Sequence, residues 1–212
     1  MLQAQLKGLV SDEHFSVDGT LFEAWASHKS FRRKGRRRQR QRRLHGERRR
    51  NDTHESTTDP DARLARKGAG KEAKLSYQAS TLMENRNGLI VAVDVRQASG
   101  TAEREAALDL IDEMLLGEGC TVGADKGNDT AAFIEALTKR RIVPHVAQST
   151  AGRRSAVPDR VARTKGYAAS QEIRKRIEQG FGWTKTIGGL RKLMRVCNAF
   201  AHGRHGRSLL TT

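Results

Sequence analysis

The chain has 212 residues, enough for one domain with an appendage and for a sizeable core. It carries 40 Lys and Arg against 24 Asp and Glu, and the net charge of +16 favours a polyanionic partner such as nucleic acid over a small neutral substrate. Two cysteines are too few for a disulfide framework or a cysteine-rich zinc site, and the longest apolar run, residues 89–93, is too short to span a membrane. We therefore expect a soluble cytoplasmic protein.

The first predicted element is a strand at residues 15–22, which read Phe-Ser-Val-Asp-Gly-Thr-Leu-Phe. Asp18 lies in the middle of this otherwise largely apolar or small run. Because burying an unpaired carboxylate is very costly, Asp18 needs a partner. We place the start of the folded domain at residues 1–30.

An arginine tract follows the first strand. Positions 32–50 contain twelve Lys or Arg and a single acid, Glu47, and no core can be built from them. A polar loop at 51–62 comes next, so we expect residues 31–70 to form one long basic insertion that is largely disordered. The tract is compatible both with a solvated loop and with contacts to nucleic-acid phosphates.

Residues 71–195 are expected to complete the domain. Alternation at 75–79, an Asn-Gly turn at 85–88 and a β-branched run at 89–95 predict a hairpin, to which the first strand adds a third strand. The later elements alternate between helices and strands: a helix after an N-cap at Thr101, a strand at 120–125, a helix at 131–141 capped by Asp129, a strand at 142–147, a basic loop at 148–166 and a helix from 168. This order of elements predicts an α/β fold, a ribonuclease-H-like mixed sheet flanked by helices.

The last predicted helix carries Arg174, Glu178 and Lys185 within roughly 40° of one another. One acid then lies between two bases on a single stripe. An Arg and a Glu four residues apart are also an ordinary surface pair that stabilises a helix by about 0.2–0.5 kcal/mol. The stripe alone is therefore compatible both with a functional site and with an ordinary surface pair.

Three acids occupy special positions: Asp18 in the first strand, Asp125 at the carboxyl end of a later strand, and Glu178 on the last helix. Oxygen ligands of this kind suit Mg²⁺ or Mn²⁺, and two such ions could activate a nucleophile and stabilise the leaving oxygen of a phosphodiester. Without a cation the three would repel one another. Other acids are assigned structural roles, namely Asp94, Asp109, Asp112, Glu113, Asp129 and Glu172. His145 is expected to be a satisfied core residue, and Trp25 and Trp183 are expected to pack.

Seven blocks in the right order carry a family resemblance. They begin with the Asp18 strand and end with Pro144-His-Val-Ala-Gln, and they include Thr101-Ala-Glu-Arg-Glu-Ala-Ala and Gly123-Ala-Asp-Lys. Together they resemble the catalytic domain of bacterial insertion-sequence transposases of the DDE type, over most of residues 10–195. The last helix fits that group's Tyr-(2)-Arg-(3)-Glu-(6)-Lys signature, with Gln171 in the tyrosine position.

The resemblance implies a function and a set of site residues. Asp18, Asp125 and Glu178 would be the catalytic triad and hold Mg²⁺ or Mn²⁺, while Arg174 and Lys185 would contact transposon-end DNA. We add Lys126, which follows Asp125, to the DNA-binding residues. The implied activity is phosphodiester hydrolysis followed by strand transfer on double-stranded DNA, in a nucleoid-associated protein that could act as a homodimer.

The chain also departs from the family pattern. Only seventeen residues precede Asp18, and residues 196–212 look like a basic, disordered tail rather than an apolar closing helix. We interpret the chain as a truncated copy. Two other functions fit the residues: a basic nucleic-acid binder without catalysis, and a stand-alone nuclease that cuts DNA without joining it.

Overall fold

The computed structural model describes residues 2–35, 49–149, 152 and 154–193. Most of the arginine tract and all of the tail at 196–212, for which we predicted disorder, lie outside these ranges. The larger sheet has seven strands: β1 (His14–Ala24), β4 (Arg63–Ala65), β5 (Lys74–Glu84), β6 (Leu89–Gln97), β7 (Thr121–Ala124), β8 (Val143–Val146) and β9 (Lys192–Leu193). A two-stranded sheet consists of β2 (Phe31–Arg33) and β3 (His54–Ser56). The helices are α1 (Leu2–Leu6), α2 (Ala102–Glu113), α3 (Ala131–Lys139), α4 (Asp159–Ala162), α5 (Lys165–Ile173) and α6 (Arg176–Thr186).

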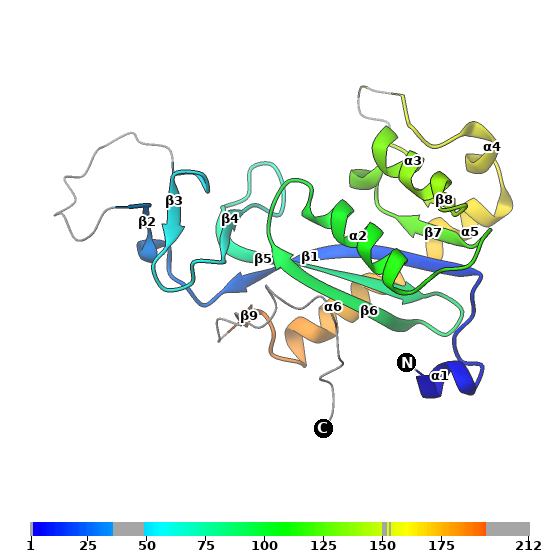
Figure 1. Ribbon diagram of the computed structural model, residues 1–212, viewed down its shortest axis with the longest axis horizontal. Helices are drawn as coiled ribbons and strands as arrows, with labels where there is room; N and C mark the ends of the chain where they lie inside the picture. The colour runs from blue at the N-terminus through cyan, green and yellow to red at the C-terminus, as the bar shows by residue number, and fades with distance from the viewer. Residues whose placement is uncertain (1, 36–48, 150–151, 153, 194–212) are drawn as a thin grey trace.

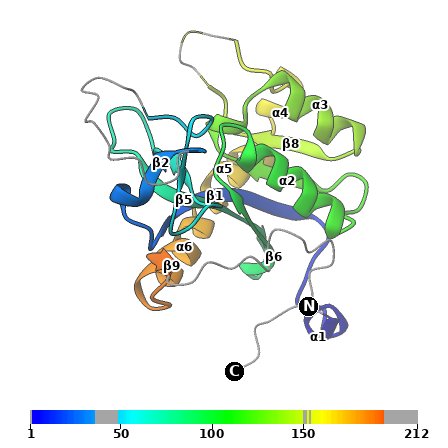
Figure 2. The ribbon, with the colours of Figure 1, turned by 60° about the vertical axis from the view of Figure 1, so that its left-hand side comes forward.

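The strand order of the larger sheet is β4-β5-β1-β7-β8, with β6 also paired to β5 and β9 to the far end of β1. Strands β1, β5 and β6 form an antiparallel meander, whereas β1, β7 and β8 run parallel. The helix α2 lies over one face of the meander and α6 over the other (Figures 1 and 2). This confirms the predicted fold class, a mixed sheet flanked by helices with a ribonuclease-H-like strand order.

The main core lies between the sheet and the helices α2 and α3. Strand residues alternate between faces, so that one side of β1 and β7 is apolar and contacts the apolar stripes of both helices. Fully buried members include Phe15, Val122, Leu110, Phe133 and Leu137. This packing fixes β1 and β7 side by side, which matters for the residues at their ends.

The predicted N-cap of α2 is confirmed in position, whereas that of α3 was wrong. Thr101 stands at the N-cap position of α2, but its side chain makes no capping bond, and Ser99 Oγ accepts from the Ala102 amide instead. The cap of α3 is Thr130, whose hydroxyl accepts from the Phe133 amide. The neighbouring Asp129 is buried and accepts from amides of the loop after β8.

The predicted last helix is divided in two. α5 ends at Ile173 and α6 begins at Arg176, so Arg174 lies at the junction while Glu178 and Lys185 lie on α6. The three residues therefore do not form a single helical stripe. The helix α6 continues through Gly180 and Gly182.

Three other expectations differ from the structure. The short strands β2, β3 and β4 occur within 31–70, where we predicted none. Trp25 and Trp183 are exposed rather than packed, at 61% and 64%. His145 is buried as expected, but its Nδ1 has no hydrogen-bond partner among the described residues.

No helix in the described ranges is long and apolar enough to cross a membrane.

Candidate catalytic cleft

Among the residues that the structure describes, no strand pairs with one edge of β1 at its middle. On this side β7 pairs only with residues 14–16 of β1, and β9 only with Glu23 and Ala24. Asp18 lies in the interval between them and is paired on the other side with Thr81 of β5. Since Ser16 is opposite Gly123, continuing the parallel register brings Asp125 beside Asp18 just as β7 ends. Neighbouring strands therefore bring these two predicted acids together.

In each of these acids, one carboxylate oxygen accepts hydrogen bonds from residues that follow it closely in the chain. Asp18 Oδ1 accepts from the Gly19 amide at 2.8 Å. Asp125 Oδ1 accepts from the Gly127 amide at 2.8 Å and from Asn128 Nδ2 at 3.0 Å, within the 3₁₀ turn η2 (Lys126–Asn128). Among the described residues no donor reaches the second oxygen of either acid. One oxygen of each carboxylate is thus available to a ligand.

A third acid, Glu103, reaches the same place from the first turn of α2. A Cβ added at Gly19 would lie 2.8 Å from Glu103 Cγ and 2.3 Å from Gln78 Nε2, so only glycine lets α2 approach β1 this closely. Glu103 also accepts from Asn128 Nδ2 at 3.4 Å. The sequence interpretation missed this acid because a Glu in the first helical turn is usually explained by the helix dipole.

Replacing Gly19 with Ala is expected to lower the free energy of unfolding by about 1–3 kcal/mol, because Glu103 and Gln78 must both move. Urea denaturation measures the loss. The control is Gly182→Ala in α6, where an added Cβ meets nothing within 4 Å and helix propensity predicts a gain of up to about 1 kcal/mol. Equal stability of Gly19→Ala and the unmodified protein would contradict the close packing of Glu103 and Gln78 against Gly19.

The cluster of acids changes the titration of Asp18. Burial raises the pKa of its carboxyl to about 7, the Gly19 amide opposes this shift, and the negative charges of Glu103, Asp125 and Glu178 add to it in that order. The pKa of Glu103 is also raised, first by burial and then by Asp125. An acid in such surroundings binds either a proton or a cation near neutral pH.

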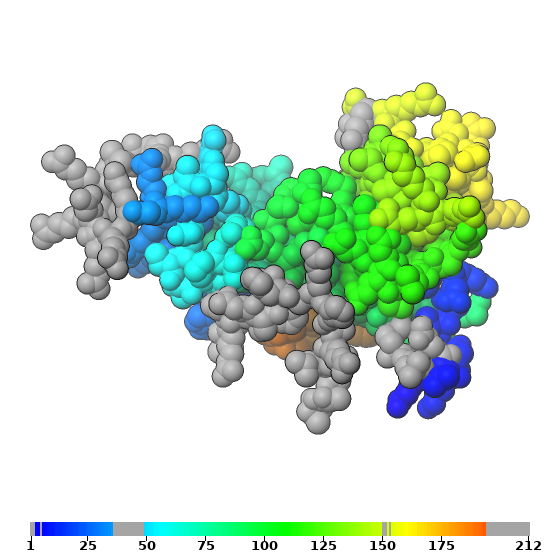
Figure 3. All heavy atoms as spheres, in the orientation of Figure 1, coloured from blue at the N-terminus to red at the C-terminus, as the bar shows by residue number. Residues whose placement is uncertain are grey.

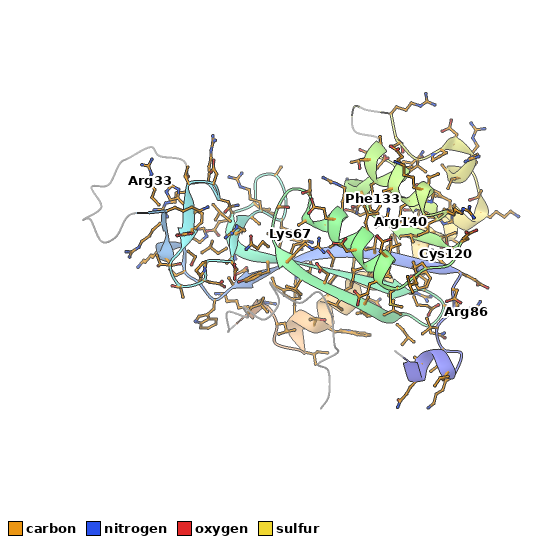
Figure 4. All side chains as sticks on the ribbon, viewed as in Figure 1. Arg33, Lys67, Arg86, Cys120, Phe133 and Arg140 are labelled. Carbon is orange, nitrogen blue, oxygen red and sulfur yellow. The ribbon has the colours of Figure 1, made fainter. Side chains whose placement is uncertain are left out.

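The cleft at this edge has a volume of about 530 Å³. Asp18, Asp125 and Glu103 line it, together with the cationic side chains of Arg66, Lys67 and Arg104. In Figure 4, Lys67 lies beside β1 and β5, whereas Arg33 lies at the outer end of the arm formed by β2 and β3. In the space-filling view this arm extends away from the body of the domain (Figure 3).

The structure does not bring every predicted site residue into the cleft. Glu178 is exposed on α6 and is not among the lining residues, although its charge acts on Asp18. Arg174 is half-buried, and its Nε donates to Gln171 Oε1 at 3.0 Å. Gln171, in the signature's tyrosine position, donates to the carbonyl of His145. No three His, Cys, Asp or Glu side chains of the described residues are arranged to hold a metal ion.

The two predicted lysines have different surroundings. Lys185 Nζ donates to Thr20 Oγ1 at 2.5 Å and lies 5.2 Å from the Phe22 ring centroid. Burial lowers the pKa of Lys185, and the charges of Lys67 and Arg191 lower it further, so several cations lie close together along the edge of β1. Lys126 is exposed in the turn directly after Asp125.

Comparison with known proteins identifies the family of the chain. The model of the transposase DDE domain family matches residues 11–210. The chain belongs to this family. The match covers more than the predicted resemblance over 10–195 and includes most of the tail that we had set apart. Searches of curated proteins and of solved structures gave no significant match.

DDE transposases act on DNA and typically use a divalent metal ion. In this transposase the donor set fits such an ion, because Asp18 and Asp125 each have a carboxylate oxygen without a hydrogen-bond donor among the described residues. Carboxylate oxygens are the ligands that Mg²⁺ and Mn²⁺ prefer. A cation would also neutralise the repulsion that, after burial, contributes to the raised pKa of Asp18.

Proposed function

We propose that this transposase hydrolyses phosphodiester bonds at the ends of an insertion sequence. The freed 3′-hydroxyl then attacks a phosphodiester of target DNA, which joins the two strands and releases a 3′-hydroxyl of the target. The observation that carries the proposal is the pairing of β1 with β7, which sets Asp18 and Asp125 at one open sheet edge inside a cleft with a basic wall. These acids would hold Mg²⁺ or Mn²⁺, and Glu178 would join them from α6. When bound, the metal would supply an activated oxygen nucleophile and stabilise the leaving oxygen.

The side chains around the cleft would bind and orient the DNA. Arg66 and Lys67 are exposed on one wall, and Lys185 lies close enough to Lys67 for their charges to repel. A phosphate backbone along this wall would relieve that repulsion, and we assign Arg174 and Lys126 to the flanking DNA. Contacts of this kind position the duplex without reading its sequence.

The test uses a duplex that contains the DNA flanking the gene, incubated with Mg²⁺ or with EDTA. We expect nicks at the element ends only with Mg²⁺. Adding a plasmid as target and labelling the 5′ end of the strand that gains the free 3′-hydroxyl distinguishes the candidate functions. Labelled plasmid indicates strand transfer, and cutting without joining indicates a nuclease. Salt-sensitive binding without nicks would indicate a non-catalytic binder and would contradict the proposal.

The basic wall leads to a separate prediction. Replacing Arg66 and Lys67 together by Ala should weaken binding to any duplex and reduce the slope of log K against log salt by about 2, because each phosphate contact contributes about 0.9. Fluorescence anisotropy at several salt concentrations measures the slope. The control variant replaces Arg86 and Lys139, two other exposed cations. In Figure 4, Arg86 lies at the right of the molecule, away from Lys67 near its middle. Equal slopes for both variants would argue against this wall as the DNA path.

A further inference from the structure

Asn128 is a buried amide between two carboxylates of the cleft. The residue is 2% exposed, and its Nδ2 donates to Asp125 Oδ1 at 3.0 Å and to Glu103 Oε1 at 3.4 Å. Its own backbone amide donates to the Asp125 carbonyl at 3.1 Å, which closes the turn. One neutral donor group thus links the end of β7 to the first turn of α2.

This link acts on a single oxygen of Asp125. Oδ1 accepts from Asn128 and from the Gly127 amide, and a Cβ at residue 127 would lie only 3.0 Å from that oxygen. Two donors in fixed positions define the rotation of the carboxylate. The other oxygen, Oδ2, has no donor among the described residues. The arrangement resembles the way in which metal-binding carboxylates are oriented by hydrogen bonds from residues that do not touch the metal.

We propose that Asn128 is a positioning residue, which orients Asp125 for cation binding and ties it to Glu103 on α2. The inference rests on the proposed function, in which Asp125 is a ligand of the cation. Asn128 itself does not contact the metal or the DNA. It acts through Asp125, so its loss should weaken cation binding and slow cleavage without changing the affinity for duplex DNA.

Asn128→Ala tests this role in the full chain. We expect the affinity for Mn²⁺, measured without DNA by electron paramagnetic resonance, to fall by about 10–100-fold. The cleavage rate constant with saturating DNA should fall by a similar factor, while the dissociation constant for a duplex of the flanking DNA stays within about twofold. Asn128→Ser, whose hydroxyl is too short to reach either carboxylate, should behave in the same way.

The matched control is Asn87→Ala, which removes an asparagine from the β5–β6 turn and should leave Mn²⁺ affinity and cleavage unchanged. Wild-type Mn²⁺ affinity in Asn128→Ala would overturn the proposal. If Asp125→Ala nevertheless abolished Mn²⁺ binding and cleavage, the proposed function would stand without it. Failure of both Asn128 variants to fold, judged by circular dichroism, would also overturn it, because the residue would then be structural.

Discussion

Replacing Asp18 with Asn is expected to stabilise the metal-free protein above pH 7. Burial and the neighbouring acids raise the pKa of Asp18 from 3.8 to about 7, so between these values the folded chain holds a proton that the unfolded chain has lost. The stability of the unmodified protein therefore falls as pH rises through this window. Asn keeps an oxygen for the Gly19 amide and carries no charge, so the gain at pH 8 should be on the order of 4 kcal/mol at most.

Urea denaturation in EDTA at pH 4 and pH 8 measures this difference, which should vanish near pH 4. Asp112→Asn is the control of opposite sign, because the Arg140 hydrogen bond lowers the pKa of Asp112 and its neutralisation should destabilise the protein at pH 8. Adding Mg²⁺ should raise the stability of the unmodified protein but not of Asp18→Asn. If Asp18→Asn were less stable than the unmodified protein at pH 8, the ionised Asp18 would not destabilise the folded chain, and the prediction would be wrong.

Replacing Asp125 with Ala should reduce the rate of DNA cleavage by a factor on the order of 10³ or more, because a proposed metal ligand is lost. Binding to duplex DNA should change little, since the basic wall remains. Single-turnover cleavage of end-labelled flanking DNA measures the rate, and anisotropy measures the binding.

The control for this experiment is Asp109→Ala, which removes an exposed acid of α2 whose partner Arg96 keeps its bond to Asp94. Its cleavage rate should match that of the unmodified protein. Cleavage by Asp125→Ala at an undiminished rate would remove this acid from the catalytic set, whatever the fold.

Much of the fold could be predicted because its signals are local. The period-two pattern of β5, the Asn-Gly turn and the β-branched residues of β6 lie within one short segment, and each agrees with the others. The three-residue strands β2 and β3 could not be predicted, because they pair across the arginine tract and have no periodic pattern. The break between α5 and α6 was equally hidden, since no proline or glycine marks residues 174–175.

The candidate site was predictable in part for the same reason. Asp18 and Asp125 stand out as acids in or after apolar strands, and parallel pairing brings them together. Glu103 and Asn128 do not stand out, because each has an ordinary local explanation, a helix-start acid and a turn amide. Only the packing of α2 against Gly19 shows that they share one cleft. For Glu178, helical periodicity indicated a shared stripe with Arg174, and the helix break removed it.

The central claim is that Asp18 and Asp125 hold a divalent cation at the open edge of β1. A crystal structure of the protein soaked in Mn²⁺, with anomalous diffraction, tests it most directly. We predict an anomalous peak about 2.2 Å from one oxygen of Asp18 and one of Asp125, with Glu178 drawn toward it. A fully occupied peak elsewhere, or none at these two carboxylates at saturating Mn²⁺, would contradict the claim.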